Sequence, residues 1–283
     1  MPAPTQPQKA DTLHALHHNG ELLKLPNIWN PIGARILEAK GHPAVATASA
    51  AISAALGYAD GELISRNTLV EQVSRIANSV DVPVTADIET GFGESTDELA
   101  ETIRLITEAG AVGINLEDSI DENHTLRSID EQCERIATAR ATANLAGINL
   151  YINARIDAFF CRQFATTKDA LAEISIRSQA YLQAGASGIY PIGNSTLDVA
   201  KQIRDLTEAP INLLALPHAA KPSELAKIGI NRLSYGPFVF RTCLQKLHET
   251  IDAIDESDNY DSISSGFSTE HVGPYLKLES EEA

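Results

Sequence analysis

The chain has 283 residues, 43% of them hydrophobic, and its 22 Lys and Arg against 38 Asp and Glu give a formal net charge of -16. A chain of this length can bury a large apolar core, and an acidic chain with no basic cluster is not expected to bind nucleic acid or an anionic membrane. Its three cysteines form no CxxC pair, which argues against a disulfide framework or a structural zinc site and favours the reducing cytoplasm.

The two ends of the chain differ from its middle. Residues 1–22 are too polar for a secretory signal and are expected to form an N-terminal helical segment, and no stretch approaches the ~18 apolar residues of a membrane span. From Glu249 onward there are ten acidic residues and one basic residue, which is -9 of the total -16. We therefore expect residues 23–255 to form the catalytic domain and residues 256–283 to form an acidic, solvated tail.

Between the ends, short apolar runs rich in Val, Ile and Ala alternate with longer segments of helical periodicity. The runs predict eight strands, at residues 25–29, 44–48, 82–88, 113–117, 150–155, 188–192, 212–216 and 232–235. The segments between them predict helices at residues 33–40, 69–79, 95–109, 130–144, 168–184, 195–207 and 222–228.

Eight strand-then-helix units in roughly 250 residues are typical of a (β/α)8 TIM-type barrel. The predicted strands are almost continuously apolar, as parallel strands covered by helices should be. The alternative is an open doubly wound sheet, but the first strand is not followed by the GxGxxG of a dinucleotide site. The sequence therefore favours an α/β fold of the barrel type.

Acidic residues lie where the predicted strands end, which in a barrel is the side that carries the active site. Asp60 follows the second strand, Asp87 and Glu89 stand two apart at the end of the third, and Glu117 ends the fourth. Four carboxylates at one barrel mouth repel one another unless a cation lies among them. Oxygen ligands with no His or Cys nearby favour Mg²⁺ or Mn²⁺ over zinc.

The fifth strand adds a fixed cation to this mouth. Arg155 has a planar guanidinium that binds a carboxylate or phosphoryl group through two hydrogen bonds. The Gly91-Phe92-Gly93 turn after Glu89 lacks two side chains and is expected to bring its backbone close to a ligand. These features predict a site for a small anionic substrate.

Three motifs in order give the chain a resemblance to a known family. The stretches PVTADIETGFG, AGAVGINLEDS and INARIDAFF, together with flanking segments from about Leu25 to Ile254, resemble the isocitrate lyase and phosphoenolpyruvate mutase superfamily. The resemblance implies a (β/α)8 barrel with a C-terminal helix swapped between subunits of a homodimer or homotetramer. It also implies a metal ion, Mg²⁺ or Mn²⁺, that binds a 2-oxo acid and stabilises its enolate.

The resemblance also implies roles for the acidic residues. Asp87 matches the direct metal ligand of the family, whereas Asp60, Glu89 and Glu117 match the acids that hold the metal's water molecules.

Substrate-binding positions are implied in the same way. Arg155 matches the arginine that binds the substrate carboxylate, and Thr47, Ala48 and Ser49 match the loop whose backbone receives the carboxylate and oxo oxygens. Asn212 resembles a further polar contact from the seventh strand.

The chain departs from the family at the residues that carry out catalysis in its carbon–carbon lyases. The catalytic cysteine of the carbon–carbon lyases lies in a Lys-Lys/Arg-Cys-Gly-His segment, but here the segment reads SIDENHTLRSIDEQ, and Cys133 lies well downstream. The substitutions Ala46 and Ala48 also remove an aromatic residue and a serine that the phosphonate-processing members carry.

In the same loop, Asn123 and His124 offer replacement chemistry. We expect His124 to act as an acid or base and Asn123 to orient a substrate oxygen. A solvated loop histidine is the alternative interpretation.

Three functions remain open from the sequence. The first is a Mg²⁺-dependent lyase or decarboxylase of a small 2-oxo or 2-hydroxy carboxylate such as oxaloacetate, because that chemistry needs the metal but no cysteine acid. The second is a phosphonopyruvate-processing mutase or hydrolase. The third is a non-catalytic 2-oxo-acid binding protein with the same fold.

Overall fold

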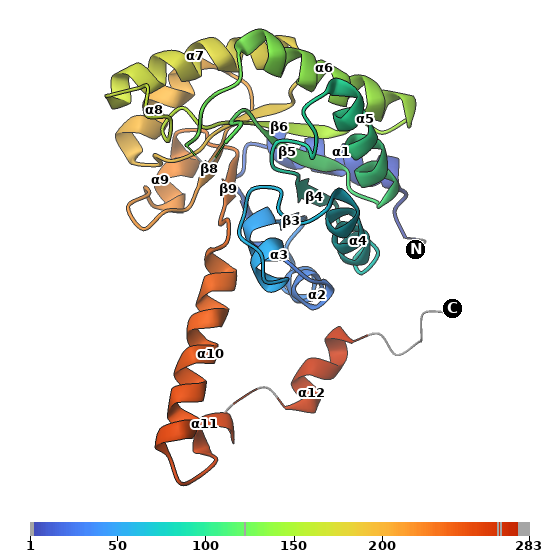
Figure 1. The fold of residues 1–283 in the computed structure, drawn as a ribbon, viewed down its shortest axis with the longest axis vertical. Coiled ribbons are helices and arrows are strands. Elements are labelled where there is room, and N and C mark those ends of the chain that lie inside the picture. The colour runs from blue at the N-terminus through green and yellow to red at the C-terminus, as the bar shows by residue number, and fades with distance from the viewer. Residues whose placement is uncertain (1–2, 122, 265, 267, 277–283) are drawn as a thin grey trace.

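The computed structural model describes residues 3–121, 123–264, 266 and 268–276. All its strand pairs within sheets are parallel, and helices surround the strands (Figure 1). The strands are β1 (Leu23–Leu25), β2 (Asn27–Ile28), β3 (Val45–Thr47), β4 (Val84–Asp87), β5 (Gly113–Glu117), β6 (Tyr151–Ile156), β7 (Gly188–Pro191), β8 (Asn212–Leu214) and β9 (Arg232–Ser234).

The strands close into a barrel. One sheet has the order β2-β3-β4-β5-β6-β7 and the other has the order β1-β9-β8. Pro26, which cannot donate a ladder hydrogen bond, separates β1 from β2, and a parallel bridge between Ile189 and Ile211 joins the two sheets at their other edge. The predicted eight-strand barrel is therefore confirmed, with its first strand divided in two.

The helices follow the expected alternation, with the expected N-terminal helix before them and additional helices after β3 and at the C-terminal end. They are α1 (Gln6–His18), α2 (Pro31–Ala39), α3 (Ser49–Ala55), α4 (Arg66–Ala77), α5 (Thr96–Glu108), α6 (Ile129–Leu145), α7 (Thr167–Gln183), α8 (Leu197–Leu206), α9 (Pro222–Lys227), α10 (Phe238–Glu256), α11 (Asp261–Ser264), α12 (Thr269–Val272) and the 3-10 turn η1 (Gly273–Tyr275).

Helix α5 shows why the sequence forms these elements. Its buried residues Leu99, Ile103 and Ile106 recur at helical spacing and face the barrel. At its start, Ser95 and Glu98 form a capping box that satisfies the first free amide groups. Helix α3 was not predicted, because SAAISAA combines small residues with one isoleucine and shows no clear apolar face.

Helix α1 covers the N-terminal ends of the strands. Leu13 is fully buried against the start of β5, where a Cβ on Gly113 would lie 2.7 Å from its Cδ2 atom. The ring of His17 stacks on Tyr151, at the start of β6, at 3.8 Å. Burial, and to a lesser extent Arg232, lower the pKa of His17 to about 3, so this histidine is neutral. The barrel is closed at this end, and its strands end at the opposite mouth.

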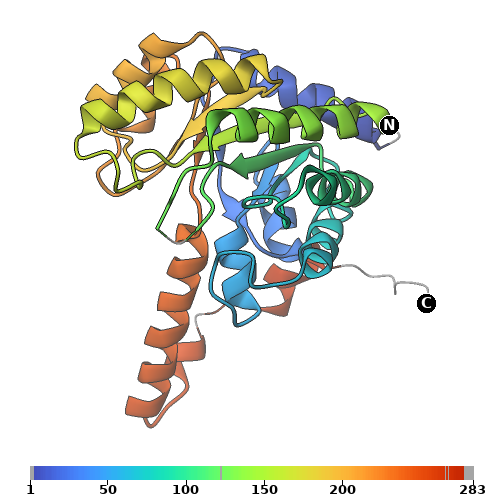
Figure 2. The same ribbon diagram turned by 45° about the horizontal axis from the view of Figure 1, so that its top comes forward.

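At the other end of the chain, α10 leaves the barrel body, as both ribbon views show (Figures 1 and 2). The described residues that follow it form α11, α12 and η1, and Tyr275 accepts a hydrogen bond from Arg35 of α2 through its carbonyl oxygen at 3.0 Å. Residues 277–283 of the expected tail lie outside the described residues. No helix among the described residues is long and apolar enough to span a membrane.

We predict that Leu13→Ala lowers the free energy of unfolding by about 2–5 kcal/mol, because it leaves a cavity in the barrel floor. Leu145→Ala is the matched control, since Leu145 is 91% exposed and its truncation removes no buried contact. Urea denaturation of both variants measures the difference. Equal losses of unfolding free energy in the two variants would contradict the conclusion that α1 packs into the barrel core.

Candidate active site at the barrel mouth

A cavity of about 520 Å³ opens where the strands end. It is lined by residues from the loops after α3, β4 and β5 and from the ends of strands β5 and β6, namely Ala59, Asp60, Gly61, Glu62, Leu63, Glu89, Thr90, Glu117, Ser119, Ile120, Asp121, His124 and Arg155. Five of the predicted site residues are in this group: Asp60, Glu89, Glu117, His124 and Arg155. Three of the four predicted acids thus meet the predicted arginine and histidine in one cavity.

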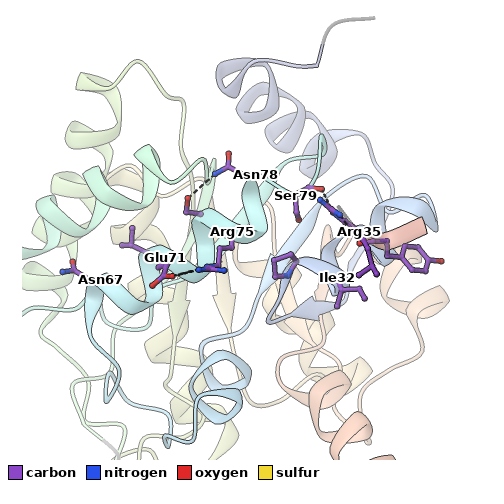
Figure 3. A pocket seen from close by; sticks show the side chains of 12 residues that line it. Ile32, Arg35, Asn67, Glu71, Arg75, Asn78 and Ser79 are labelled. Carbon is purple, nitrogen blue, oxygen red and sulfur yellow. Dashed lines mark hydrogen bonds and ion pairs between the residues drawn. The ribbon is translucent and has the colours of Figure 1, made fainter. Parts of the chain in front are cut away.

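A larger hollow of about 690 Å³ lies elsewhere, between α2, α4 and the C-terminal segment (Figure 3). Its charged side chains already have partners: Arg75 pairs with Glu71 at 2.8 Å, and Arg35 binds the carbonyl oxygens of Ser79 and Tyr275. This hollow lies outside the barrel, away from the strand ends. The mouth of the barrel is therefore the candidate active site.

Asp87 ends β4 and is held from two sides. Its Oδ2 atom accepts hydrogen bonds from the backbone amide and the hydroxyl of Ser49, at 3.2 and 3.1 Å. Its own amide donates to Thr47 Oγ1 at 2.9 Å, and Asn115 lies 3.5 Å from Oδ1. The loop that was predicted to bind substrate therefore lies directly against the predicted metal ligand.

Glu89 is buried with one carboxylate oxygen unpartnered. Its Oε2 atom accepts hydrogen bonds from the amides of Gly61 and Glu62, at 2.8 and 2.7 Å, whereas Oε1 has no partner among the residues that the structure describes. Burial, followed by the charges of Asp60 and Asp87, raises the pKa of Glu89 to about 8. A proton or a cation at Oε1 is needed to offset this repulsion.

The other two acids experience the same crowding. Partial desolvation, followed by the charge of Asp87, raises the pKa of Asp60, although Asp60 lies at the exposed rim of the cavity. Burial raises the pKa of Glu117 well above its ordinary value, even though Arg155 Nη1 lies 2.5 Å from its Oε2 atom. The three acids thus share an environment that disfavours their charge.

Arg155 is shared between two carboxylates of the chain. Its Nε and Nη2 atoms donate to the two oxygens of Asp157, at 2.6 and 2.8 Å, while Nη1 pairs with Glu117. A guanidinium has five N–H donors, so hydrogens on both Nη atoms remain for a substrate carboxylate. Arg155 therefore neutralises the site and still has the capacity to bind an anion.

His124 belongs to a network that the sequence did not reveal. Its Nδ1 atom lies 2.9 Å from Asp157 Oδ2, and Ser119 donates to the same oxygen at 3.2 Å. Although burial opposes its charge, Arg155 and the hydrogen bond from His124 hold the pKa of Asp157 at about 2, so this carboxylate is ionised. An ionised Asp157 therefore fixes the orientation of the imidazole ring through Nδ1.

Behind this network, Asp118 positions Asp157. Asp118 Oδ1 accepts the backbone amide of Asp157 at 2.9 Å, and its Oδ2 accepts hydrogen bonds from Arg177 and Tyr181. Burial raises the pKa of Asp118 to about 6. Only the sequence position of Asp118, directly after Glu117, hinted at a role.

Five predicted substrate-contacting residues do not line the cavity, and one of them, Ser49, binds Asp87 as described above. Thr47 and Ala48 lie beside it, at the end of β3 and at the N-cap of α3. Asn123 is exposed in its loop, and its backbone amide donates a hydrogen bond to the side chain of Asp121. Asn212 is buried at the first residue of β8, where it accepts a hydrogen bond from Ser234. Their proposed contacts with substrate stay predictions.

The acids fit a hard divalent cation. Within the described ranges, no three His, Cys, Asp or Glu side chains are arranged to hold one ion directly. Mg²⁺ commonly binds through one or two carboxylates and keeps several water molecules. One direct ligand with surrounding water-binding acids suits that chemistry, and the unpartnered Glu89 Oε1 is consistent with it.

Comparisons with known proteins agree with this architecture. Residues 13–255 match the phosphoenolpyruvate phosphomutase family. An uncharacterized protein of Mycobacterium tuberculosis is 28% identical over 253 residues, which cover 87% of this chain and 90% of that protein. The oxaloacetate decarboxylase of Pseudomonas entomophila is 25% identical over 244 residues, which cover 82% and 80%. A crystal structure of a protein described as a "putative phosphonomutase" from Burkholderia cenocepacia J2315 has a TM-score of 0.83 and 33% identity, and covers 88% of this chain and 99% of that one.

The raised pKa of Glu89 predicts how stability depends on pH. The folded-state pKa, about 8, lies above the ordinary value of 4.5, so the folded protein holds this proton more tightly than the unfolded chain. The resulting stabilisation is present below about pH 4.5 and is lost as the pH rises to 8. We predict that Glu89→Gln, which cannot ionise, flattens this decline when metal-free protein is unfolded by urea between pH 5 and 8.

The same variant should lose its stabilisation by Mg²⁺. For the wild type, a hundredfold excess over Kd adds about 2.7 kcal/mol to the free energy of unfolding. Glu98→Gln is the control, because Glu98 lies outside the cavity in the capping box of α5. Identical pH slopes and identical Mg²⁺ effects in Glu89→Gln and wild type would refute the metal site.

Proposed function

The chain belongs to the phosphoenolpyruvate phosphomutase family, and from this premise we propose that it is a Mg²⁺-dependent lyase or decarboxylase of a small, oxaloacetate-like 2-oxo or 2-hydroxy carboxylate. The observation that carries the proposal is the meeting of Asp60, Glu89 and Glu117 with Arg155 and His124 in one cavity. Curated relatives support the substrate class, since they include oxaloacetate decarboxylases and 2-methylisocitrate lyases.

In this proposal Asp87 is the direct ligand of the metal, and Asp60, Glu89 and Glu117 hold its water molecules. When bound, Mg²⁺ or Mn²⁺ supplies Lewis-acid stabilisation of the charge that develops on the 2-oxo oxygen as the adjacent carbon–carbon bond breaks. Ser49 keeps Asp87 in place through two hydrogen bonds to Oδ2. The acids thus set the position at which that charge is stabilised.

We assign the substrate carboxylate to Arg155 and to the backbone of Thr47, Ala48 and Ser49. Arg155 is fixed by its two bonds to Asp157 before substrate arrives. A preorganised guanidinium loses little freedom on binding and therefore orients the substrate effectively. Asn123 and Asn212 are proposed as further polar contacts with the substrate. For Asn123, this contact requires the loop after β5 to move.

We propose His124 as the group that transfers the proton. Asp157 binds Nδ1 at 2.9 Å, which leaves Nε2 as the atom that exchanges a proton with substrate. The cysteine of the lyases has no counterpart here, because none of the three free cysteines lines the cavity. Cys133 lies in α6, where burial raises the pKa of its thiol.

The deciding experiment is a screen with Mg²⁺ of oxaloacetate, phosphonopyruvate, methylisocitrate and substituted malates, read by pyruvate formation. We predict pyruvate from a 2-oxo or 2-hydroxy carboxylate and none in EDTA. Phosphoenolpyruvate or phosphate from phosphonopyruvate would instead identify a mutase or hydrolase. Ligand-induced stabilisation without any turnover would identify a binding protein.

For the substrate found, we predict that His124→Gln lowers kcat by about 10²–10⁴ without changing the affinity for Mg²⁺. His218→Gln is the matched control, because His218 is exposed after β8 and does not line the cavity. Asp87→Ala should abolish both metal binding and turnover. Full activity of His124→Gln would remove the imidazole from the mechanism.

We further propose that the protein is a homodimer or homotetramer in which α10 packs against another subunit. Leu244, Leu247, Ile251 and Ile254 are 42%, 55%, 48% and 45% exposed, and their spacing of three, four and three residues forms one stripe. Such a stripe is typical of a helix that packs against a partner helix.

The three free cysteines support a reducing, cytoplasmic location.

Leu247→Glu combined with Ile251→Glu should dissociate the oligomer, since it places charge in the apolar stripe. Lys246→Glu combined with Glu249→Lys is the control, because it reverses an exposed pair at 3.6 Å outside that stripe. Light scattering after gel filtration gives the mass of each. A monomeric wild type would overturn the assignment.

A further inference from the structure

Two loops at the mouth bind each other through a reciprocal pair of carboxylates. Glu89, in the loop after β4, accepts the amides of Gly61 and Glu62, in the loop after α3. In return, Glu62 Oε1 accepts the hydroxyl of Thr90 at 2.6 Å and the amide of Phe92 at 2.9 Å. Each loop therefore supplies the acid that satisfies the backbone of the other, and we refer to this pair of contacts as the loop latch.

The loop after β4 makes few hydrogen bonds within itself. The carbonyl oxygens of residues 90–94 are all bound by side chains from three helices. Arg135 of α6 donates to Thr90, Gly93 and Glu94, while Thr102 of α5 donates to Gly91 and Arg66 of α4 donates to Phe92, as the hydrogen bonds at 2.5–3.0 Å show. Because buried carbonyls must find donors, these side chains determine the path of the loop.

Arg135 provides three of these hydrogen bonds, and we refer to them as the Arg135 clamp. It is only 1% exposed and has no ion-pair partner among the described residues, so its guanidinium serves backbone carbonyls alone. The two glycines fit the clamp, because a Cβ at Gly91 would lie 2.5 Å from Leu99 and one at Gly93 would lie 2.3 Å from Glu98. The turn therefore packs closely against helix α5. Its approach to a ligand stays a prediction.

The latch holds its residues in unfavourable backbone conformations. Glu62, Glu89 and Phe92 have φ angles of 59°, 52° and 57°, in the left-handed region that side chains disfavour. Such conformations persist only where surrounding contacts impose them. Without the latch, we expect both loops to relax and Asp60 and Glu89 to leave their positions.

We propose that Glu62 is a positioning residue that, together with the Arg135 clamp, holds the two metal-site acids Asp60 and Glu89 in place. Glu62 acts as a hydrogen-bond acceptor for Thr90 and Phe92, and its charge is not required. This role rests on the proposed function, since the positions of Asp60 and Glu89 matter for catalysis only when a metal is bound. The latch itself consists of contacts within the chain, so it is testable without a metal.

The test is amide hydrogen exchange of the metal-free protein in segments 59–63 and 88–94. Glu62→Ala should speed exchange there at least tenfold while leaving β6 and α7 unchanged. Glu62→Gln keeps an acceptor oxygen and should stay within about threefold of wild type. Thr90→Val, which removes one bond of the latch and keeps the shape, should give an intermediate increase, and Glu71→Gln on α4 is the surface control.

Binding of Mn²⁺ to the same proteins provides the second readout. Glu62→Ala should weaken Mn²⁺ binding at least tenfold, and Glu62→Gln should restore most of it. Unchanged exchange in both Glu62→Ala and Thr90→Val would overturn the proposal, as would equal damage in Glu62→Gln and Glu62→Ala. If the wild type bound no Mn²⁺, the proposed function would fail, whereas the exchange data would still decide the latch.

Discussion

Repulsion between carboxylates is the constraint on which the rest of the site depends. Asp60, Glu89 and Glu117 face one cavity with Asp87 beside them, and the pKa values of all three are raised by burial and by the neighbouring acids. Arg155 is the one Lys or Arg among the described residues that lines this cavity, and it already serves two carboxylates. The cavity therefore has an excess of carboxylates that the proposed divalent cation would offset.

The same region concentrates backbone strain. Of the residues that the structure describes, four non-glycine residues have positive φ angles, and all four, Glu62, Glu89, Phe92 and His124, lie at or next to the mouth. Conformations of this kind cost on the order of 1–3 kcal/mol each and persist where the surrounding structure imposes them. Here the imposing contacts come from the loop latch, from helix side chains such as Arg66 at Phe92, and from Asp157 at His124.

The fold was predictable because the spacing of apolar residues along the chain indicates where strands and helices form. Apolar runs and helical spacing located the eight strands, and the rule that parallel strands end at one mouth placed Asp87, Glu89, Glu117 and Arg155 near one another. Helix α3 escaped detection because its small residues carry no apolar contrast. Asn212 illustrates another limit, because it opens both the predicted strand 212–216 and β8, so that its expected substrate contact rested on the family resemblance and not on a place at the end of a strand.

The contacts that position the site could not be predicted from periodicity. Arg135 binds carbonyls 41–45 residues away, and His124 meets Asp157 33 residues away. Such pairs depend on three-dimensional proximity and leave no pattern in a single sequence.

The most direct test of the account is the number of protons released when Mg²⁺ binds, measured by titration calorimetry in buffers of different ionisation enthalpy. With the pKa of Glu89 at about 8, we predict release of about one proton or more at pH 7, falling as the pH approaches 9. Mg²⁺ binding without proton release at pH 7, or no binding at all, would contradict a metal that replaces protons on these carboxylates.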